Sequence, residues 1–169
     1  MREQRRHRAT AARLPGARER DFETYVAGAA GRLLHAATLL TTEPPGRAPR
    51  AQALLTAALG ATYARWDRLR GEDPYALTRH ELATRFARAA WRFHRPRGGV
   101  LSPLAPLERL VVVLRLYEGV AEEQTAALLG LPVERVRATC ARSVTTLRRA
   151  PGTRSTPDAR RAPGTRGAS

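Results

Sequence analysis

The sequence predicts an all-α protein built from two small helical units. Apolar residues recur at three- and four-residue steps in six segments of the chain, which is the period of helices with one buried face. No segment shows a convincing strand pattern. Clusters of Pro and Gly separate the six segments and give the helices their expected ends.

The first expected helix covers residues 21–41, with Asp21 as a candidate N-cap and the Pro-Gly stretch 43–46 at its end. Its apolar face contains Phe22, Val26, Ala29, Leu33, Ala37 and Leu40. The second helix covers residues 49–69 and ends at the turn 70–72. Its apolar face contains Leu55, Leu59, Tyr63, Trp66 and Leu69.

Asp73 and Pro74 predict a well-defined start for the third helix. Asp73 can accept hydrogen bonds from the first turn, and Pro74 lacks an N–H at a position where none is needed. The apolar face of this helix contains Leu82, Phe86, Ala89 or Ala90, and Phe93.

A Pro- and Gly-containing segment at residues 96–105 is the expected linker between the two units. It separates a unit at residues 21–95 from one at residues 106–149. Residues 1–20 and 150–169 are rich in Arg, Pro, Gly or Ser, and we expect them to be disordered basic tails. Such tails either hold DNA loosely or simply keep the chain soluble.

The C-terminal unit has the spacing of a helix-turn-helix. A helix from Leu107 ends at Gly119, and a short helix covers residues 121–129. Gly130 is the turn residue, and Pro132 begins a longer helix. Ala126, Leu129, Leu131 and Val136 are expected to pack in the angle between the last two helices. The buried face of the last helix is predicted to contain Val133, Val136, Cys140, Val144 and Leu147.

The opposite face of the last helix is polar and mostly basic. It contains Glu134, Arg135, Arg137, Ala138, Arg142 and Thr145. Arg can pair with guanine through two hydrogen bonds, and Glu can accept one from cytosine, so this face suits the major groove. Arg148 and Arg149 come late on the helix and are expected to contact phosphate. The alternative is an ordinary helix pair with a solvated polar face, in which Glu134 pairs with a nearby Arg.

The formal net charge is +15, and all thirty basic residues are Arg, which favours a polyanionic partner over an idle basic surface. Cys140 is the single cysteine, which excludes an internal disulfide and fits a reducing cytoplasm. The Arg-rich start lacks the apolar stretch of a signal peptide. The most apolar run, residues 110–114, is too short to span a membrane.

Little in the sequence favours an enzyme. His7, His35, His80 and His94 are widely spaced, and His80-Glu81 is not followed by a His at metal-binding spacing. No Gly-rich phosphate loop is present. Glu122 and Glu123 are explained by the helix dipole, which favours acidic residues in the first turn. We therefore expect no metal, no cofactor and no catalytic site.

Residues 107–120, Leu-Glu-Arg-Leu-Val-Val-Val-Leu-Arg-Leu-Tyr-Glu-Gly-Val, resemble the first part of region 4 in extracytoplasmic-function sigma factors of the sigma-70 family. Residues 122–137, Glu-Glu-Gln-Thr-Ala-Ala-Leu-Leu-Gly-Leu-Pro-Val-Glu-Arg-Val-Arg, resemble the rest of it. Residues 54–59 and 63–67 look like region 2 more loosely, in the style of actinobacterial members.

The resemblance implies a sigma factor that binds core RNA polymerase and promoter DNA. Region 4 would read the −35 element with Arg135, Arg137, Ala138 and Arg142. Region 2 would read the −10 element with the third helix, which contains Arg79, Arg85, Arg88, Trp91 and Arg92. Trp91 could stack on an exposed base, as could Phe86, although Phe86 is better explained as core. Family members also bind anti-sigma proteins, which are a further candidate partner.

The second helix would meet the polymerase clamp through Gln52, Ala53, Thr56 and Ala57. These residues stand where family members usually have an acidic pair followed by Gln and a polar residue. The chain also contains no Asn for the −10 segment, and Pro132 stands where a capping Ser is common. Two alternatives follow: a helix-turn-helix regulator that does not bind polymerase, and a protein-interaction module.

Overall fold

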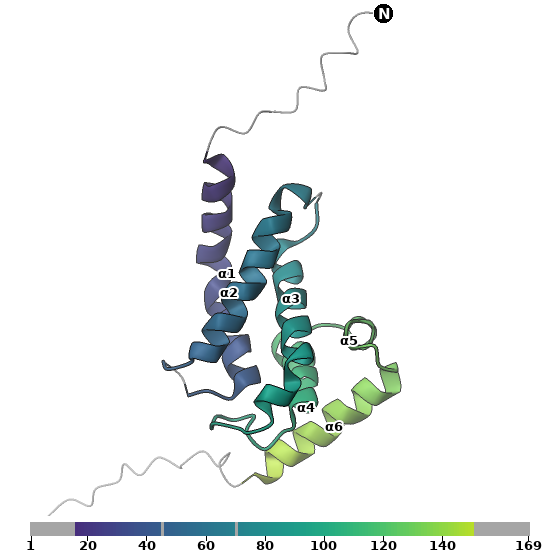
Figure 1. Cartoon of the computed structure of the whole chain (residues 1–169). Coiled ribbons are helices and arrows are strands. Elements are labelled where there is room, and N and C mark those ends of the chain that lie inside the picture. The colour runs from purple at the N-terminus through teal and green to yellow at the C-terminus, as the bar shows by residue number, and fades with distance from the viewer. Residues whose placement is uncertain (1–15, 45, 70, 151–169) are drawn as a thin grey trace, which may run out of the picture.

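The computed structural model describes residues 16–44, 46–69 and 71–150. The described residues form six α-helices and no strand, which confirms the all-α prediction (Figure 1). The helices are α1 (Ala17–Thr41), α2 (Pro49–Arg65), α3 (Pro74–Arg88), α4 (Pro106–Val112), α5 (Glu122–Leu129) and α6 (Val133–Arg149). Two 3-10 turns, Trp66–Arg68 and Ala90–Phe93, extend α2 and α3, and a π turn, Val113–Tyr117, extends α4.

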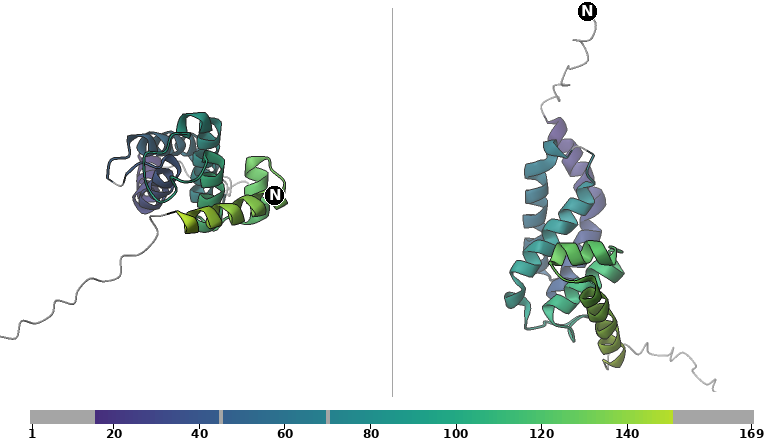
Figure 2. Two further views of the ribbon diagram at one scale, coloured as in Figure 1. Left: turned by 90° about the horizontal axis from the view of Figure 1, so that it is seen from below. Right: turned by 90° about the vertical axis from the view of Figure 1, so that its right-hand side faces the viewer.

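Helices α1, α2 and α3 lie side by side and form a three-helix bundle, while α5 and α6 project to one side of it (Figures 1 and 2). Small side chains line the contacts within the bundle. Ala36, Ala37, Ala51 and Ala58 are all almost completely buried. Because alanine side chains are short, the helix backbones can approach closely, and larger buried side chains such as Leu33, Leu82 and Phe86 fill the remaining space.

Local sequence signals explain where the helices begin, with one exception. Asp73 caps α3 as predicted, accepting hydrogen bonds from Tyr75 N at 2.9 Å and Ala76 N at 3.2 Å. Asp21 does not cap α1, because that helix already begins at Ala17 after Gly16, whose φ is +84°. Residues 17–20 of the expected N-terminal tail are therefore helical. Residues 1–15 and 151–169, which make up most of the two expected tails, lie outside the described residues.

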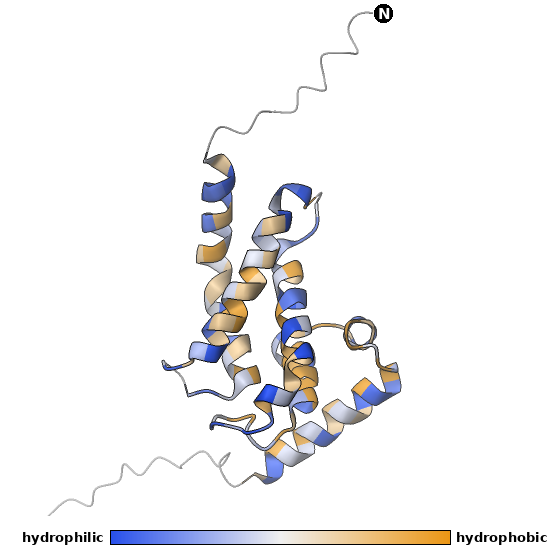
Figure 3. Ribbon diagram, viewed as in Figure 1, coloured by the Kyte–Doolittle hydropathy of each residue, from blue (hydrophilic) through white to orange (hydrophobic). Residues whose placement is uncertain are grey.

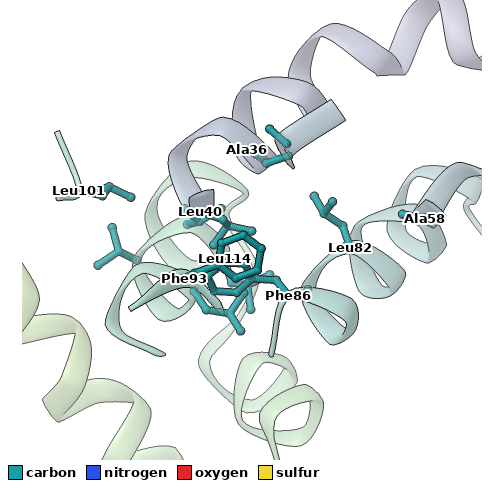
Figure 4. Close-up of a cluster of buried hydrophobic side chains, with 14 of the residues drawn as sticks. Ala36, Leu40, Ala58, Leu82, Phe86, Phe93, Leu101 and Leu114 are labelled. Atoms are coloured by element: carbon teal, nitrogen blue, oxygen red, sulfur yellow. The ribbon is translucent and has the colours of Figure 1, made fainter. Parts of the chain in front are cut away.

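The main hydrophobic core contains residues from both sides of the expected linker at 96–105. Leu40, Phe86 and Phe93 from the bundle meet Leu114 from the π turn (Figure 4). The rings of Phe86 and Phe93 stack with their centroids 4.9 Å apart. Leu110 and Val112 of α4 belong to this core, and the hydropathy colouring of the ribbon shows how many residues of this part of the chain are hydrophobic (Figure 3). The segment that we expected to begin a separate unit is thus packed against the bundle.

Arg109 on α4 strengthens this contact, although its side chain is only 1% exposed. It donates three hydrogen bonds to backbone carbonyls: Nε to Leu104 at 2.9 Å, Nη1 to Leu40 at 3.0 Å and Nη2 to Phe93 at 2.9 Å. These carbonyls lie at the end of α1, at the end of the 3-10 turn after α3 and in the turn before α4. Burial lowers the pKa of the Arg109 guanidinium.

Glu118 joins the turn before α5 to the bundle. Its side chain is 1% exposed and receives the hydroxyl of Tyr75 at 3.0 Å. The guanidinium groups of Arg32 on α1 and Arg79 on α3 each lie 3.7 Å from its carboxylate. A buried carboxylate needs such partners, because leaving one unpaired costs several kcal/mol, so Glu118 fixes the start of the helix-turn-helix relative to α1 and α3.

Candidate nucleic-acid interface

Helices α5 and α6 form the predicted helix-turn-helix. Gly130 ends α5 with a φ of +64°, a left-handed conformation that glycine adopts without strain. The backbone then reverses, and Leu131 N donates to Ala126 O at 3.0 Å. Ala126 is 4% exposed and packs with Val111 and Val136, as expected for a small residue where two helices cross. The angle between α5 and α6 is therefore held by a small core of its own.

The buried face of α6 contains more polar residues than the sequence predicts. Val136, Thr139 and Ser143 are buried, whereas Val133, Cys140, Val144 and Leu147 are half-buried. Ser143 satisfies its hydroxyl by donating to Thr139 O at 2.8 Å. The close approach of α6 to α4 explains this pattern, because short side chains fit where larger ones would not.

The outer face of α6 is open to solvent. The predicted phosphate-contacting residues Arg148 and Arg149 are exposed. So are all six residues predicted to face DNA bases: Glu134, Arg135, Arg137, Ala138, Arg142 and Thr145. Arg142 Nη2 lies 3.3 Å from the hydroxyl of Thr139. Since DNA-reading helices contact bases through residues near their N-terminal end, Glu134, Arg135 and Arg137 occupy the most favourable positions.

Arg137 differs from its neighbours because a carboxylate holds one edge of its guanidinium. Its Nε and Nη2 donate to the same oxygen of Glu122, at 3.0 and 2.9 Å. This hydrogen bond raises the pKa of Arg137, and the nearby charges of Glu122, Glu134 and Glu123 act in the same direction. The other oxygen of Glu122 lies 3.5 Å from Arg115 Nη2. The side chain of Arg137 nevertheless remains 63% exposed.

The residues predicted to lie against a −10 strand fall into two groups. Arg79 is paired with the buried Glu118, and Arg85 lies 3.6 Å from Glu81, so both cations have partners within the protein. Arg88, Trp91 and Arg92 are exposed, and Trp91 is 68% exposed. The guanidinium of Arg92 lies 4.9 Å from the centre of the Trp91 ring. Phe86 is completely buried, which confirms its role in the core.

The predicted clamp residues Gln52, Ala53, Thr56 and Ala57 are all exposed on α2. Two of them share an open groove of about 620 Å³ with part of the predicted −10 set. The groove is lined by Arg50, Ala53, Leu54, Ala57, Arg85, Ala89, Trp91, Arg92 and Phe93. Its lining thus combines apolar side chains, three arginines and the large exposed ring of Trp91.

Sequence reasoning missed several residues that shape these surfaces. Glu122 was explained by the helix dipole alone, yet it bridges Arg115 and Arg137. Arg50 contributes to the groove, and its guanidinium lies 6.0 Å from the Phe93 ring. The one available signal was the placement of Glu122 at the start of the first helix of a helix-turn-helix whose second helix is rich in Arg.

Two structural observations bear on other classes of protein. Within the described ranges, no three His, Cys, Asp or Glu side chains come together as a metal site would require. Every helix in the part of the chain that the structure describes is too short or too polar to span a lipid bilayer.

Comparison with known proteins places the helix-turn-helix in a family. Residues 100–149, which contain α4, α5 and α6, match the family described as "Sigma-70, region 4". The chain is also 34% identical over 154 residues to "RNA polymerase sigma-E factor" of Streptomyces coelicolor, covering 76% of this chain and 84% of the relative. The chain belongs to the sigma-70 family. Sigma factors direct RNA polymerase to promoters, and they are regulatory proteins rather than catalysts.

Two further relatives carry the same name. This sigma factor is 34% identical over 156 residues to the protein of Streptomyces avermitilis, covering 76% of the chain and 83% of the relative. It is 34% identical over 140 residues to that of Streptomyces antibioticus, covering 64% and 76%. No solved structure is a significant match. Since the first two matches extend over about three quarters of the sigma factor, the kinship is not restricted to region 4.

Proposed function

We propose that this sigma factor binds core RNA polymerase and directs it to promoters by reading two DNA elements. Region 4, at residues 106–149, reads the −35 element through the outer face of α6. A region 2-like unit, at residues 21–95, contacts the −10 element with α3 and the turn that follows it. Promoter DNA and core polymerase are thus its partners, and the cytoplasm is its place of action.

The observation that carries this proposal is the exposed face of α6, which lies in the part of the chain that matches sigma-70 region 4. Arg135, Arg137 and Arg142 are exposed on one side of a helix whose opposite side is packed against α4 and α5. Such a helix can enter the major groove without any change in its own packing. The net charge of +15 supports the same conclusion, because neutralising phosphates releases counterions.

The groove beside α3 supports contact with an opened strand. Trp91 offers an exposed ring on which a base can stack, and Arg88 and Arg92 lie near it in the sequence to neutralise phosphates. Arg79 and Arg85 are already paired with carboxylates, so we propose that they contribute less to this contact. Ala53 and Ala57 of the proposed polymerase face line the same groove as Trp91 and Arg92, which supports a single surface for both contacts.

A reconstitution with core polymerase tests the proposal. The purified full-length chain is mixed with core RNA polymerase from Streptomyces coelicolor, and the complex is isolated and used for run-off transcription on genomic fragments. Specific transcripts that depend on the chain are the expected result. The variant Arg135→Ala/Arg142→Ala should reduce those transcripts without preventing complex formation, because both side chains lie on the proposed −35 face. Failure to bind polymerase would contradict the proposal.

A second function has one specific observation in its favour. Gln52, Ala53, Thr56 and Ala57 provide no charge for a contact with the clamp, although family members usually have an acidic pair there. A regulator that binds DNA through region 4 but not polymerase would show this pattern. Specific DNA binding without polymerase binding in the reconstitution would establish that role. An anti-sigma protein is a further proposed partner, and neither function requires a catalytic site.

A further inference from the structure

Glu122 and Arg137 lie on different helices of the helix-turn-helix, and their contact fixes the direction of one exposed side chain. Both N–H groups on the inner edge of the Arg137 guanidinium donate to one oxygen of Glu122, at 3.0 and 2.9 Å. A guanidinium has five N–H groups, so three remain, including the pair on its outer edge. Two parallel N–H groups are the arrangement that matches O6 and N7 of guanine.

Glu122 is itself held in place. Its second carboxylate oxygen lies 3.5 Å from Arg115 Nη2, and Arg115 donates through Nη1 to the carbonyl of Val120. The side chain of Glu122 is 22% exposed, whereas that of Arg137 is 63% exposed. The carboxylate is therefore a fixed support beneath a side chain that reaches into solvent.

The other arginines of this face lack such a support. Arg135, Arg148 and Arg149 make no side-chain hydrogen bond or ion pair with any described residue, and Arg142 contacts only the hydroxyl of Thr139. A free Arg side chain loses rotamer entropy when it binds, and a flexible one satisfies a phosphate as easily as a base. Among the described arginines of this face, Arg137 is the one whose guanidinium is held by a carboxylate before DNA arrives.

We infer that Glu122 is a positioning residue that orients Arg137 to read a guanine, while the other arginines of α6 chiefly supply charge toward phosphate. This inference rests on the proposed function of α6 at the −35 element. Glu122 also removes positive charge from the interface, so it lowers affinity for DNA of any sequence while raising discrimination between sequences. A residue with a merely structural role would not lower affinity and raise discrimination together, so these two opposite effects identify a positioning role.

The test measures binding of the full-length chain to DNA by fluorescence anisotropy. The preferred duplex is first selected from a random library with the wild-type protein, and each G·C pair in it is then replaced by A·T. For wild type, one replacement should weaken binding at least about fivefold, the effect of losing a bidentate base contact. Arg137→Ala should remove this discrimination at the same position.

Glu122→Gln is the decisive variant, and Glu123→Gln is its matched control. Both change the same charge in the first turn of α5, but Glu123 is exposed and is not hydrogen-bonded to Arg137. In Glu122→Gln, the ratio of affinities for the G·C and A·T duplexes should fall at least about threefold, and random DNA should bind more tightly. Glu123→Gln should bind random DNA more tightly and keep the discrimination. Glu122→Gln should have no further effect on discrimination in the Arg137→Ala background.

Equal discrimination by Glu122→Gln and Glu123→Gln would overturn the inference while leaving the proposed function intact. A wild-type protein that selects no sequence from the library would instead overturn the proposed reading of DNA by α6, and the inference with it. Thermal unfolding followed by circular dichroism verifies that both variants remain folded, so that a loss of discrimination reports on the interface.

Discussion

The hydroxyl of Tyr75 lies 3.0 Å from both carboxylate oxygens of Glu118. This hydrogen bond connects α3 to the turn before α5. Burial of Tyr75, together with the negative charge of Glu118 and the hydrogen bond to it, raises the pKa of that hydroxyl. Burial likewise raises the pKa of Tyr25 and of Tyr117. Folding therefore holds these hydroxyl groups in their protonated form.

We expect the protein to lose stability as the pH rises above about 10, the pKa of an ordinary tyrosine. Above that pH the unfolded chain releases protons that the folded chain keeps, so the free energy of unfolding decreases with pH. Urea unfolding at about pH 8 and about pH 10.5 measures the effect. Tyr75→Phe should make the dependence less steep, because it removes the group with the largest shift. An unchanged slope would contradict the assignment to Tyr75.

Replacement of Arg109 should be strongly destabilising. Arg109→Met keeps much of the length of the side chain but leaves the carbonyls of Leu40, Phe93 and Leu104 without their donors. We expect a loss of at least about 3 kcal/mol in the free energy of unfolding, because each unsatisfied buried acceptor costs about 1–3 kcal/mol. Arg88→Met, at an exposed position, is the control and should change stability by less than about 0.5 kcal/mol.

Two glycines should respond to alanine in opposite directions. Neither Gly130 nor Gly60 has a neighbouring atom within 4 Å of the place where a Cβ would lie. The effect of alanine on stability therefore depends on the backbone conformation at each position and not on a steric clash. Gly130→Ala should cost about 1–2 kcal/mol, because its φ of +64° is strained for alanine. Gly60→Ala, inside α2, should stabilise by about 0.5–1 kcal/mol. Thermal denaturation of both variants against wild type tests the pair.

Two buried threonines form a second contrasting pair. Thr125 is completely buried, and its hydroxyl has no hydrogen-bond partner among the described residues. Thr62 is equally buried, but its hydroxyl contacts Ala58 O at 3.1 Å and Thr78 Oγ1 at 2.8 Å. Thr125→Val should be neutral or stabilise by up to about 1 kcal/mol, whereas Thr62→Val should cost about 1 kcal/mol or more. The reverse order in urea unfolding would contradict the assigned hydrogen bonds.

Trp91→Ala should separate DNA binding from stability. Because Trp91 is 68% exposed, its loss should change the free energy of unfolding by no more than about 0.5 kcal/mol. If a base stacks on the ring, affinity for single-stranded −10 DNA should fall by about 1–3 kcal/mol. Filter binding with the polymerase complex measures this, and duplex −35 DNA serves as the control substrate. Unchanged affinity for the single strand would argue against stacking on Trp91.

Features that depend on neighbouring residues could be predicted from the sequence. Asp73 before Pro74, Gly130 between two helices and Ala126 at the crossing each follow from local chemistry, and the structure confirms all three. The exposed face of α6 followed from helical spacing in the same way. Which of its residues contact DNA stays a prediction, as does the division into units at 96–105.

Features that depend on distant contacts could not be predicted. Arg109 and Leu40 are separated by 69 positions, and nothing in the local sequence distinguishes Arg109 from the other arginines. The pairing of Arg79 with Glu118 likewise depends on how α4 and α5 meet the bundle. The helical pattern assigned Thr139 and Ser143 to neither face of the last helix, whereas contacts between helices bury both.

The three carbonyls held by Arg109 restrict how the molecule can be recombined with its relatives. A chimera that received a foreign C-terminal half without an arginine at this place would leave two carbonyls of the recipient bundle unpaired. By contrast, the outer side chains of α6 take no part in the contact between Arg109 and these carbonyls. Grafting those side chains alone is therefore the safer route to an altered promoter preference, and whole-domain exchange is the riskier one.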